Sequence, residues 1–233
     1  MSKKNSIHKK DVFLYRPPAH KNYLCQLKDF IHFLHIHGVP RPFKFSYVEA
    51  FGPLLTNLTL KDNILLESIQ NSLSETKEIQ LSKVLNQTKN GHLMKFFQEL
   101  EAKNFLNKTP MEVSPRIRKI AALVKGLLQE SDFLFFDIPE AYLTPADLDL
   151  FISALKFQIK YLDQVALITS PNEQQWFKHI TKLITRGPAQ EFVITPVLAH
   201  KIFEKHCKIE KLPPKERFYV ESLAFKIANK ESA

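Results

Sequence analysis

One acidic residue stands directly after a short apolar run and is the first candidate for chemistry. Residues 133–136 read Phe-Leu-Phe-Phe, and Asp137 follows them. The run predicts a strand buried on both faces, and open α/β sheets bind ligands at the carboxyl ends of their strands. An acid at that position commonly holds Mg²⁺ on a nucleotide. Asp137 is therefore a candidate metal ligand; the alternative is a buried strand whose aspartate caps the next turn.

A lysine at the end of a loop is the second candidate. Lys21 lies between a predicted strand at residues 11–15 and a predicted helix at residues 23–37, which is the layout of a phosphate-binding loop. The loop contains two consecutive prolines and no glycine. Proline has no N–H and a fixed φ, so we expect weak phosphate binding. Asn22 offers an amide oxygen for Mg²⁺. The alternative for Lys21 is an exposed lysine at a helix start.

The elements that would position these residues alternate between strands and helices. Apolar patterns predict strands at 47–50, 165–169 and 192–194, and helices at 115–128, 145–162 and 176–184. Ser114 and Thr144 each precede a proline and are typical N-caps. Residues 59–106 have a helical pattern throughout. Short joints between strand, helix and strand favour parallel pairing.

These patterns predict an α/β fold with a mostly parallel sheet and an inserted all-helical lobe. We expect one domain over residues 1–233. Its predicted parts are an α/β core at about 11–52 and 111–186, a helical lobe at about 53–110, and a carboxyl-terminal extension at 187–233.

Composition narrows the function classes. The 233 residues carry a net charge of +9 and two cysteines, which suits a reducing cytosol. The basic charges are scattered, which argues against a nucleic-acid site. No window has the length of apolar sequence that a membrane span needs, and the polar, basic amino terminus is unlike a signal peptide. We therefore expect a cytoplasmic protein that contacts a membrane only peripherally.

The order of the segments resembles the ATP-binding cassette (ABC) domain of transporters, a P-loop NTPase, in a degraded form. The resemblance covers residues 11–186. The Walker B and D-loop pattern, D-E-P-x-x-x-L-D-P, lies over DIPEAYLTP and keeps Asp137, while the catalytic glutamate position is Ile138. Walker A lies over YRPPAHKNYL, which keeps Lys21 and replaces serine by Asn22. The signature S-G-G-Q keeps Ser114 and loses its glycines.

Two further motifs complete the resemblance. The segment LTLKDNILL matches the sequence that follows the Q-loop, whose glutamine position is Ala50. The switch histidine position is Ser170.

The resemblance implies ATP and Mg²⁺ as ligands, with Lys21, Asn22 and Ser114 at the nucleotide and Asp137 and Asn22 at the metal. Ser114 is alternatively only an N-cap. Isoleucine at 138 can neither accept a proton nor orient water, and Glu140 is the one acid near enough to substitute. We therefore expect weak or lost nucleotide binding and no active ATPase.

The implied role is a structural or regulatory subunit that pairs with an active ATPase, or forms a dimer, and docks on a transporter's membrane subunit at the inner face of the plasma membrane. The alternative is a stand-alone basic scaffold protein that retains the fold without nucleotide binding.

Overall fold

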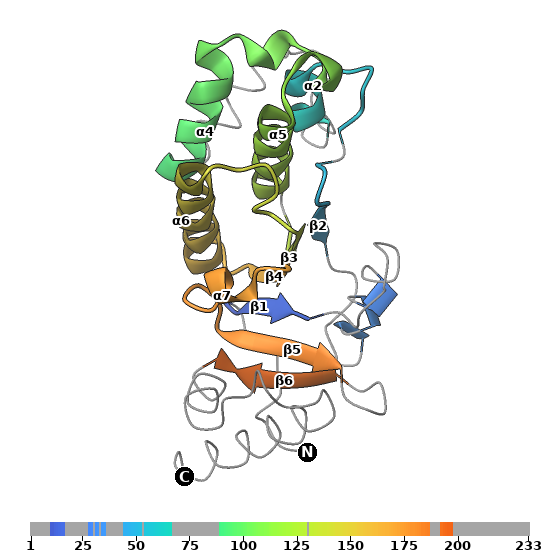
Figure 1. Cartoon of the computed structure of the whole chain (residues 1–233), viewed down its shortest axis with the longest axis vertical. Coiled ribbons are helices and arrows are strands. Elements are labelled where there is room, and N and C mark those ends of the chain that lie inside the picture. Colours follow the sequence, from blue (N-terminus) through green and yellow to red (C-terminus); the bar gives the residue numbers. More distant parts are fainter. Residues whose placement is uncertain are drawn as a thin grey trace. The chain divides into compact units, whose positions relative to one another are not determined.

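Six strands form one mixed sheet in the order β2-β3-β4-β1-β5-β6 (Figure 1). The computed structural model describes residues 10–16, 28–29, 31–32, 34–35, 44–52, 54–66, 89–129, 131–186 and 192–197. The strands are β1 (Val12–Tyr15), β2 (Phe45–Val48), β3 (Phe133–Asp137), β4 (Val165–Thr169), β5 (Lys182–Arg186) and β6 (Phe192–Pro196). The sheet is mostly parallel, so the predicted α/β class is confirmed.

From residue 115 to residue 186, helices alternate with strands along the chain. Those with described bounds are α2 (Leu60–Leu65), α4 (Gly91–Ala102), α5 (Pro115–Leu128), α6 (Pro145–Tyr161) and α7 (Glu173–Trp176), with short 3-10 turns η3 (Phe105–Asn107) and η4 (Pro110–Glu112). By contact density the chain divides into two compact units, Met1–Arg41 with Leu167–Ala233, and Pro42–Ala166. The expected domain boundaries remain predictions.

In the first unit, β1 pairs in parallel with β5, and β5 pairs antiparallel with β6. Ion pairs fix the ends of these elements. The Lys182 Nζ donates to Asp11 Oδ2 at 2.7 Å, and the Arg16 guanidinium forms an ion pair with Glu173 at the start of α7. The sheet is mixed because β6 runs antiparallel to β5.

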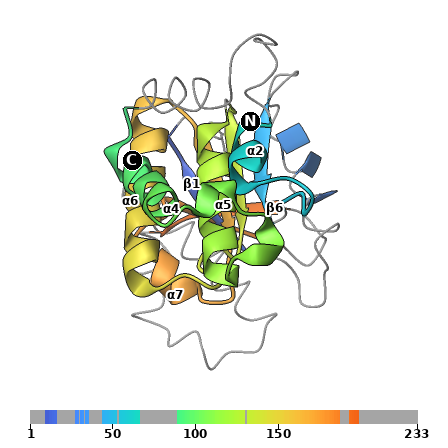
Figure 2. The ribbon, with the colours of Figure 1, turned by 90° about the horizontal axis from the view of Figure 1, so that it is seen from above.

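The second unit contains β2 and β3 and the helices that cover them. These strands pair in parallel, with Phe45 opposite Phe133 and Val48 opposite Phe136. Helix α5 packs on β2, and it contacts α2, α4 and α6; Figure 2 shows α5 between α2 and α4. A Cβ on Gly126 of α5 would lie 2.5 Å from Val48 Cγ2. Glycine is therefore needed where the helix crosses the strand.

Local signals explain where the helices of this unit begin. Ser114 Oγ accepts a hydrogen bond from the Ile117 N–H at 3.4 Å, and Pro115 occupies the first position of α5. Thr144 forms a reciprocal capping box with Asp147 at the start of α6. Every residue of β3 is buried, as the apolar run predicted.

Several predicted elements differ from the structure. The helix expected at 176–184 is wrong: α7 ends at Trp176, and residues 182–186 form β5 because they pair with both β1 and β6. β2 lies two residues earlier than the expected strand at 47–50. Within residues 53–110, predicted as a helical lobe, α2, α4 and η3 are described, whereas residues 67–88 and most of 187–233 lie outside the described residues.

Candidate functional site

Asp137 ends β3, where sequence placed it. Its side chain is buried, with 7% exposed. The chain turns immediately afterwards, through Ile138 at φ 43° and Tyr142 at φ 65°. Positive φ is costly for a β-branched residue such as isoleucine and tends to mark functional turns. Because β2 and β3 are parallel, their carboxyl ends meet at the same edge of the sheet. A ligand at Asp137 would therefore also lie near the end of β2.

A buried lysine connects the ends of these two strands. Lys119, on α5, has no exposed surface. Its Nζ donates to the backbone carbonyls of Glu49 at 2.8 Å and Ala50 at 2.9 Å, which follow β2. It also lies 3.4 Å from the backbone carbonyl of Asp137. One ammonium therefore ties the segment after β2 to the end of β3.

Burial controls the protonation of this lysine. Desolvation lowers the pKa of Lys119 to about 8, although the negative charges of Asp137, Glu140 and Glu49 act to raise it. The group therefore remains mostly charged at neutral pH. Sequence analysis missed Lys119 because lysines are seldom fully buried. The available signal was its place inside a helix whose neighbours at 117, 120 and 121 are apolar and buried.

Ser114, expected at the nucleotide, lies at the start of α5. Its Oγ is engaged by the Ile117 N–H, and Pro115 has no N–H to donate. Two of the backbone donors that a helix start offers to an anion are thus absent or occupied.

Arg116, two residues later, joins three helices. Its Nε and Nη2 donate to both carboxylate oxygens of Asp147 in α6, at 2.7 and 2.6 Å. Its Nη1 and Nη2 donate to Glu99 in α4, at 2.8 and 3.2 Å. The guanidinium therefore fixes the start of α5 between α4 and α6. Sequence reasoning missed this network because its members are far apart in the chain.

The network also fixes charge states. Burial raises the pKa of Asp147, but hydrogen bonds from Arg116 and Thr144 outweigh it, so the pKa is lowered overall. The hydrogen bonds that Arg116 donates to Asp147, and then those to Glu99, raise the pKa of Arg116. Both partners are therefore charged across the neutral range.

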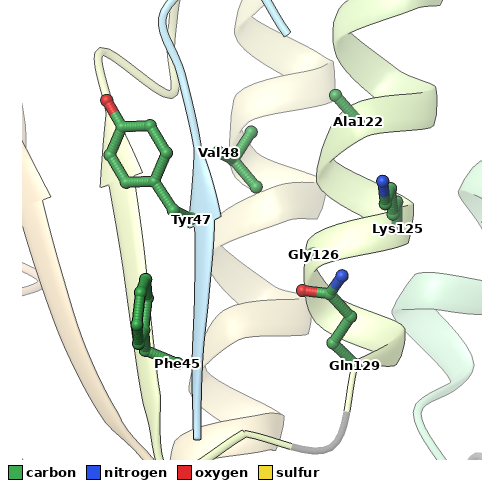
Figure 3. Close-up of a pocket in the computed structure, with 7 residues that line it drawn as sticks. All are labelled: Phe45, Tyr47, Val48, Ala122, Lys125, Gly126 and Gln129. Atoms are coloured by element: carbon green, nitrogen blue, oxygen red, sulfur yellow. The ribbon is translucent and has the colours of Figure 1, made fainter. Parts of the chain in front are cut away.

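A cavity of about 250 Å³ lies between α5 and β2 (Figure 3). Its lining residues are Phe45, Tyr47, Val48, Ala122, Lys125, Gly126 and Gln129. Val48 points toward α5, whereas Tyr47 packs against Phe135, with ring centroids 4.7 Å apart. None of the predicted site residues lines this cavity.

Comparison with solved structures identifies the fold. The ATP-binding subunit of an ABC transporter matches with a TM-score of 0.62 at 13% identity, over 92% of this chain and 89% of that one. The dimeric ATP-binding cassette MJ0796 bound to ADP and phosphate matches with a TM-score of 0.56 at 15% identity, over 78% of this chain and 82% of that one. The chain has the fold of an ABC transporter's ATP-binding cassette. A structure described as an inward-facing metal-chelate type ABC transporter matches this chain with a TM-score of 0.57 at 15% identity, over 82% of this chain and 74% of that one.

The match is visible in structure only, since no family model and no curated protein sequence matches the chain. Within the cassette fold, Ser170 follows β4, and its Oγ accepts a hydrogen bond from the Asn172 N–H at 3.0 Å. The predicted phosphate and metal residues Lys21 and Asn22 lie outside the described residues.

No group of three histidine, cysteine or acidic side chains among the described residues is placed to hold a metal ion. No helix in the same residues is long and apolar enough to cross a membrane.

Proposed function

We propose that the chain is a degenerate ABC-type ATPase-like subunit that hydrolyses ATP negligibly and acts as a structural or regulatory partner in a membrane transporter. It would pair with an active ATPase subunit or dimerise, and bind a membrane subunit from the cytoplasmic side. Any binding of ATP and Mg²⁺ would use Lys21, Asn22 and Ser114 for the nucleotide, and Asp137 with Asn22 for the metal.

The start of α5 is the observation that carries this proposal. The family resemblance places the signature motif at Ser114–Ile117, where glycines normally leave the backbone open to a phosphate. Here Pro115 removes one N–H, Ser114 engages another, and Arg116 is held by two carboxylates from α4 and α6. A segment built as a joint between helices is poorly suited to receive a phosphate.

The residue after Asp137 supports the same proposal. Asp137 itself fits a metal ligand, because its carboxylate lies at the carboxyl end of a parallel strand. Mg²⁺ there would neutralise phosphate charge. Ile138 offers no group to accept a proton from water, and loss of a general base costs about 10²–10⁴ in rate. The chain would then rely on a partner for turnover.

The test is a titration of the purified chain with a fluorescent ATP analogue, with and without Mg²⁺. Lys21→Ala and Asp137→Ala are compared with wild type, and Lys125→Ala, which lines the cavity beside β2, is the control. We expect weak, Mg²⁺-dependent binding that the first two substitutions abolish and the control retains. No saturation up to about 1 mM nucleotide, equivalent to binding weaker than about 4 kcal/mol, would favour the stand-alone scaffold.

A further inference from the structure

Two tripeptides of the same kind follow β2 and β3. Glu49-Ala50-Phe51 follows β2, and Glu140-Ala141-Tyr142 lies in the turn after β3. The two aromatic side chains are exposed, Phe51 by 73% and Tyr142 by 48%. Their ring centroids are 6.3 Å apart, with the planes inclined by 48°. We call these two rings and the two glutamates the aromatic ledge.

The backbone fixes both halves of the aromatic ledge in the same way. Each half is a turn closed by a hydrogen bond to the glutamate carbonyl, from the Gly52 N–H to Glu49 at 3.1 Å and from the Leu143 N–H to Glu140 at 3.1 Å. Gly52 has φ 65°, and a Cβ there would lie 3.0 Å from Ala122 Cβ. Large apolar side chains held on rigid turns bind partners with little entropy loss.

Lys119 ties the turn after β2 to the end of β3, which leads into the second turn. Its ammonium donates to the Glu49 and Ala50 carbonyls and lies near the Asp137 carbonyl. The ledge is therefore fastened to α5 and not only to its own loops.

Acidic side chains lie close to the buried lysine under the ledge. The carboxylates of Glu49, Glu140 and Asp137 are all near enough to act electrostatically on the Lys119 ammonium. Both glutamates are half-buried. Aromatic faces beside carboxylates attract cations, and arginine does so best because its guanidinium both stacks and hydrogen-bonds.

We propose that the aromatic ledge is a docking site for an arginine side chain of a protein partner. The guanidinium would stack on Phe51 and Tyr142, and the Glu49 and Glu140 carboxylates would balance its charge. The proposed site uses no nucleotide, so it can be tested independently of ATP binding. The net positive charge of this chain repels a partner's arginine at long range. The local acidic side chains would therefore also determine where on the surface such a partner binds.

The test uses the full chain, isotope-labelled, with the ring signals of Phe51 and Tyr142 followed by NMR. The probe is the blocked tripeptide acetyl-Gly-Arg-Gly-amide, and the matched probe contains citrulline, which has arginine's shape without its charge. We expect saturable shifts with the arginine probe and binding weaker by about fivefold with citrulline. Equal shifts with both probes, or no saturation with arginine, would overturn the proposal.

Substitutions locate the binding. Phe51→Ala, Tyr142→Leu, and the pair Glu49→Gln with Glu140→Gln should each weaken the arginine probe by about fivefold. Tyr161→Leu is the control, because Tyr161 is an exposed aromatic residue that already has Lys160 Nζ 4.9 Å from its ring centroid. Far-UV circular dichroism checks folding. If Tyr161→Leu loses as much binding as Tyr142→Leu, the proposal is also overturned. This criterion applies whether or not ATP is present.

Discussion

Arg116 and Lys119 lie one turn apart on α5, yet the chain stabilises their charges in opposite ways. Arg116 is half-exposed and paired with two carboxylates, which raise its pKa. Lys119 is fully buried, and its ammonium bonds to backbone carbonyls, so desolvation lowers its pKa. The first is a joint between helices α4, α5 and α6. The second is a joint between the ends of β2 and β3.

The difference shows how sensitive each joint is to the loss of its basic residue. A network of charged side chains tolerates partial loss, since water reaches the remaining groups. Removing a buried ammonium that is bonded to carbonyls costs the full hydrogen-bonding energy, because the carbonyl acceptors are left without donors where water cannot reach them. The Lys119 joint should therefore fail more severely than the Arg116 joint when either is removed.

The largest effect should come from Lys119→Met, which keeps the volume and removes the ammonium. We expect the free energy of unfolding to fall by about 3 kcal/mol, because the Glu49 and Ala50 carbonyls lose their donor. Urea unfolding measures this. Lys125→Met on the same helix, where the side chain is partly exposed, is the control and should change stability by about 0.5 kcal/mol at most. Equal losses of stability in Lys119→Met and Lys125→Met would contradict the special role of Lys119.

Arg116→Met should cost less, about 2 kcal/mol. Loss of a partner from a buried ion pair costs about 3–5 kcal/mol, and the 31% exposure of the Arg116 side chain reduces that. Thermal and urea unfolding measure the change. Asp149→Asn, an exposed acid on the same helix as Asp147, is the control. A loss larger than that of Lys119→Met would reverse the ranking of the two joints.

Arg116→Lys should have a smaller effect, about 1 kcal/mol, since lysine keeps the charge but cannot donate to two carboxylates in a planar fork. Combining it with Asp147→Asn separates charge from geometry. The two changes should be strongly non-additive, because both weaken the same bidentate pair of hydrogen bonds. Additive losses would mean that the arginine acts elsewhere.

The smallest effect is a pH dependence confined to the Arg116 joint. Because the pKa of Asp147 is lowered in the folded state, its contribution to stability is present above the unfolded value, about 3.9, and is lost as pH falls through the folded value. Wild type should lose stability below about pH 4 more steeply than Arg116→Met. Parallel pH curves for the two proteins would show that the pair does not stabilise the fold.

Sequence patterns predicted the elements whose signals are local. The bounds of α5 and β4 agree with the structure, and Thr144 caps α6, because caps, first-turn prolines and apolar runs act within a few residues. β5 was missed since its strand character comes from pairing with two distant strands.

The candidate site divides in the same way. The position of Asp137 at the end of β3 was predicted correctly because a buried run ends at it, and its role as a metal ligand remains a prediction. Lys119 was not, since its burial depends on carbonyls from two other segments. Ser114 has the cap geometry that was its alternative interpretation, and its role at a nucleotide remains a prediction, as do those of Lys21 and Asn22.

The central claim is that this cassette fold does not turn over ATP by itself. The most direct measurement is phosphate release by the purified chain with ATP and Mg²⁺, compared with Asp137→Asn. We predict the same background rate for both proteins, because Ile138 stands at the position of the catalytic glutamate and cannot act as a general base. Turnover by wild type that disappears in Asp137→Asn would show a working active site and contradict the account.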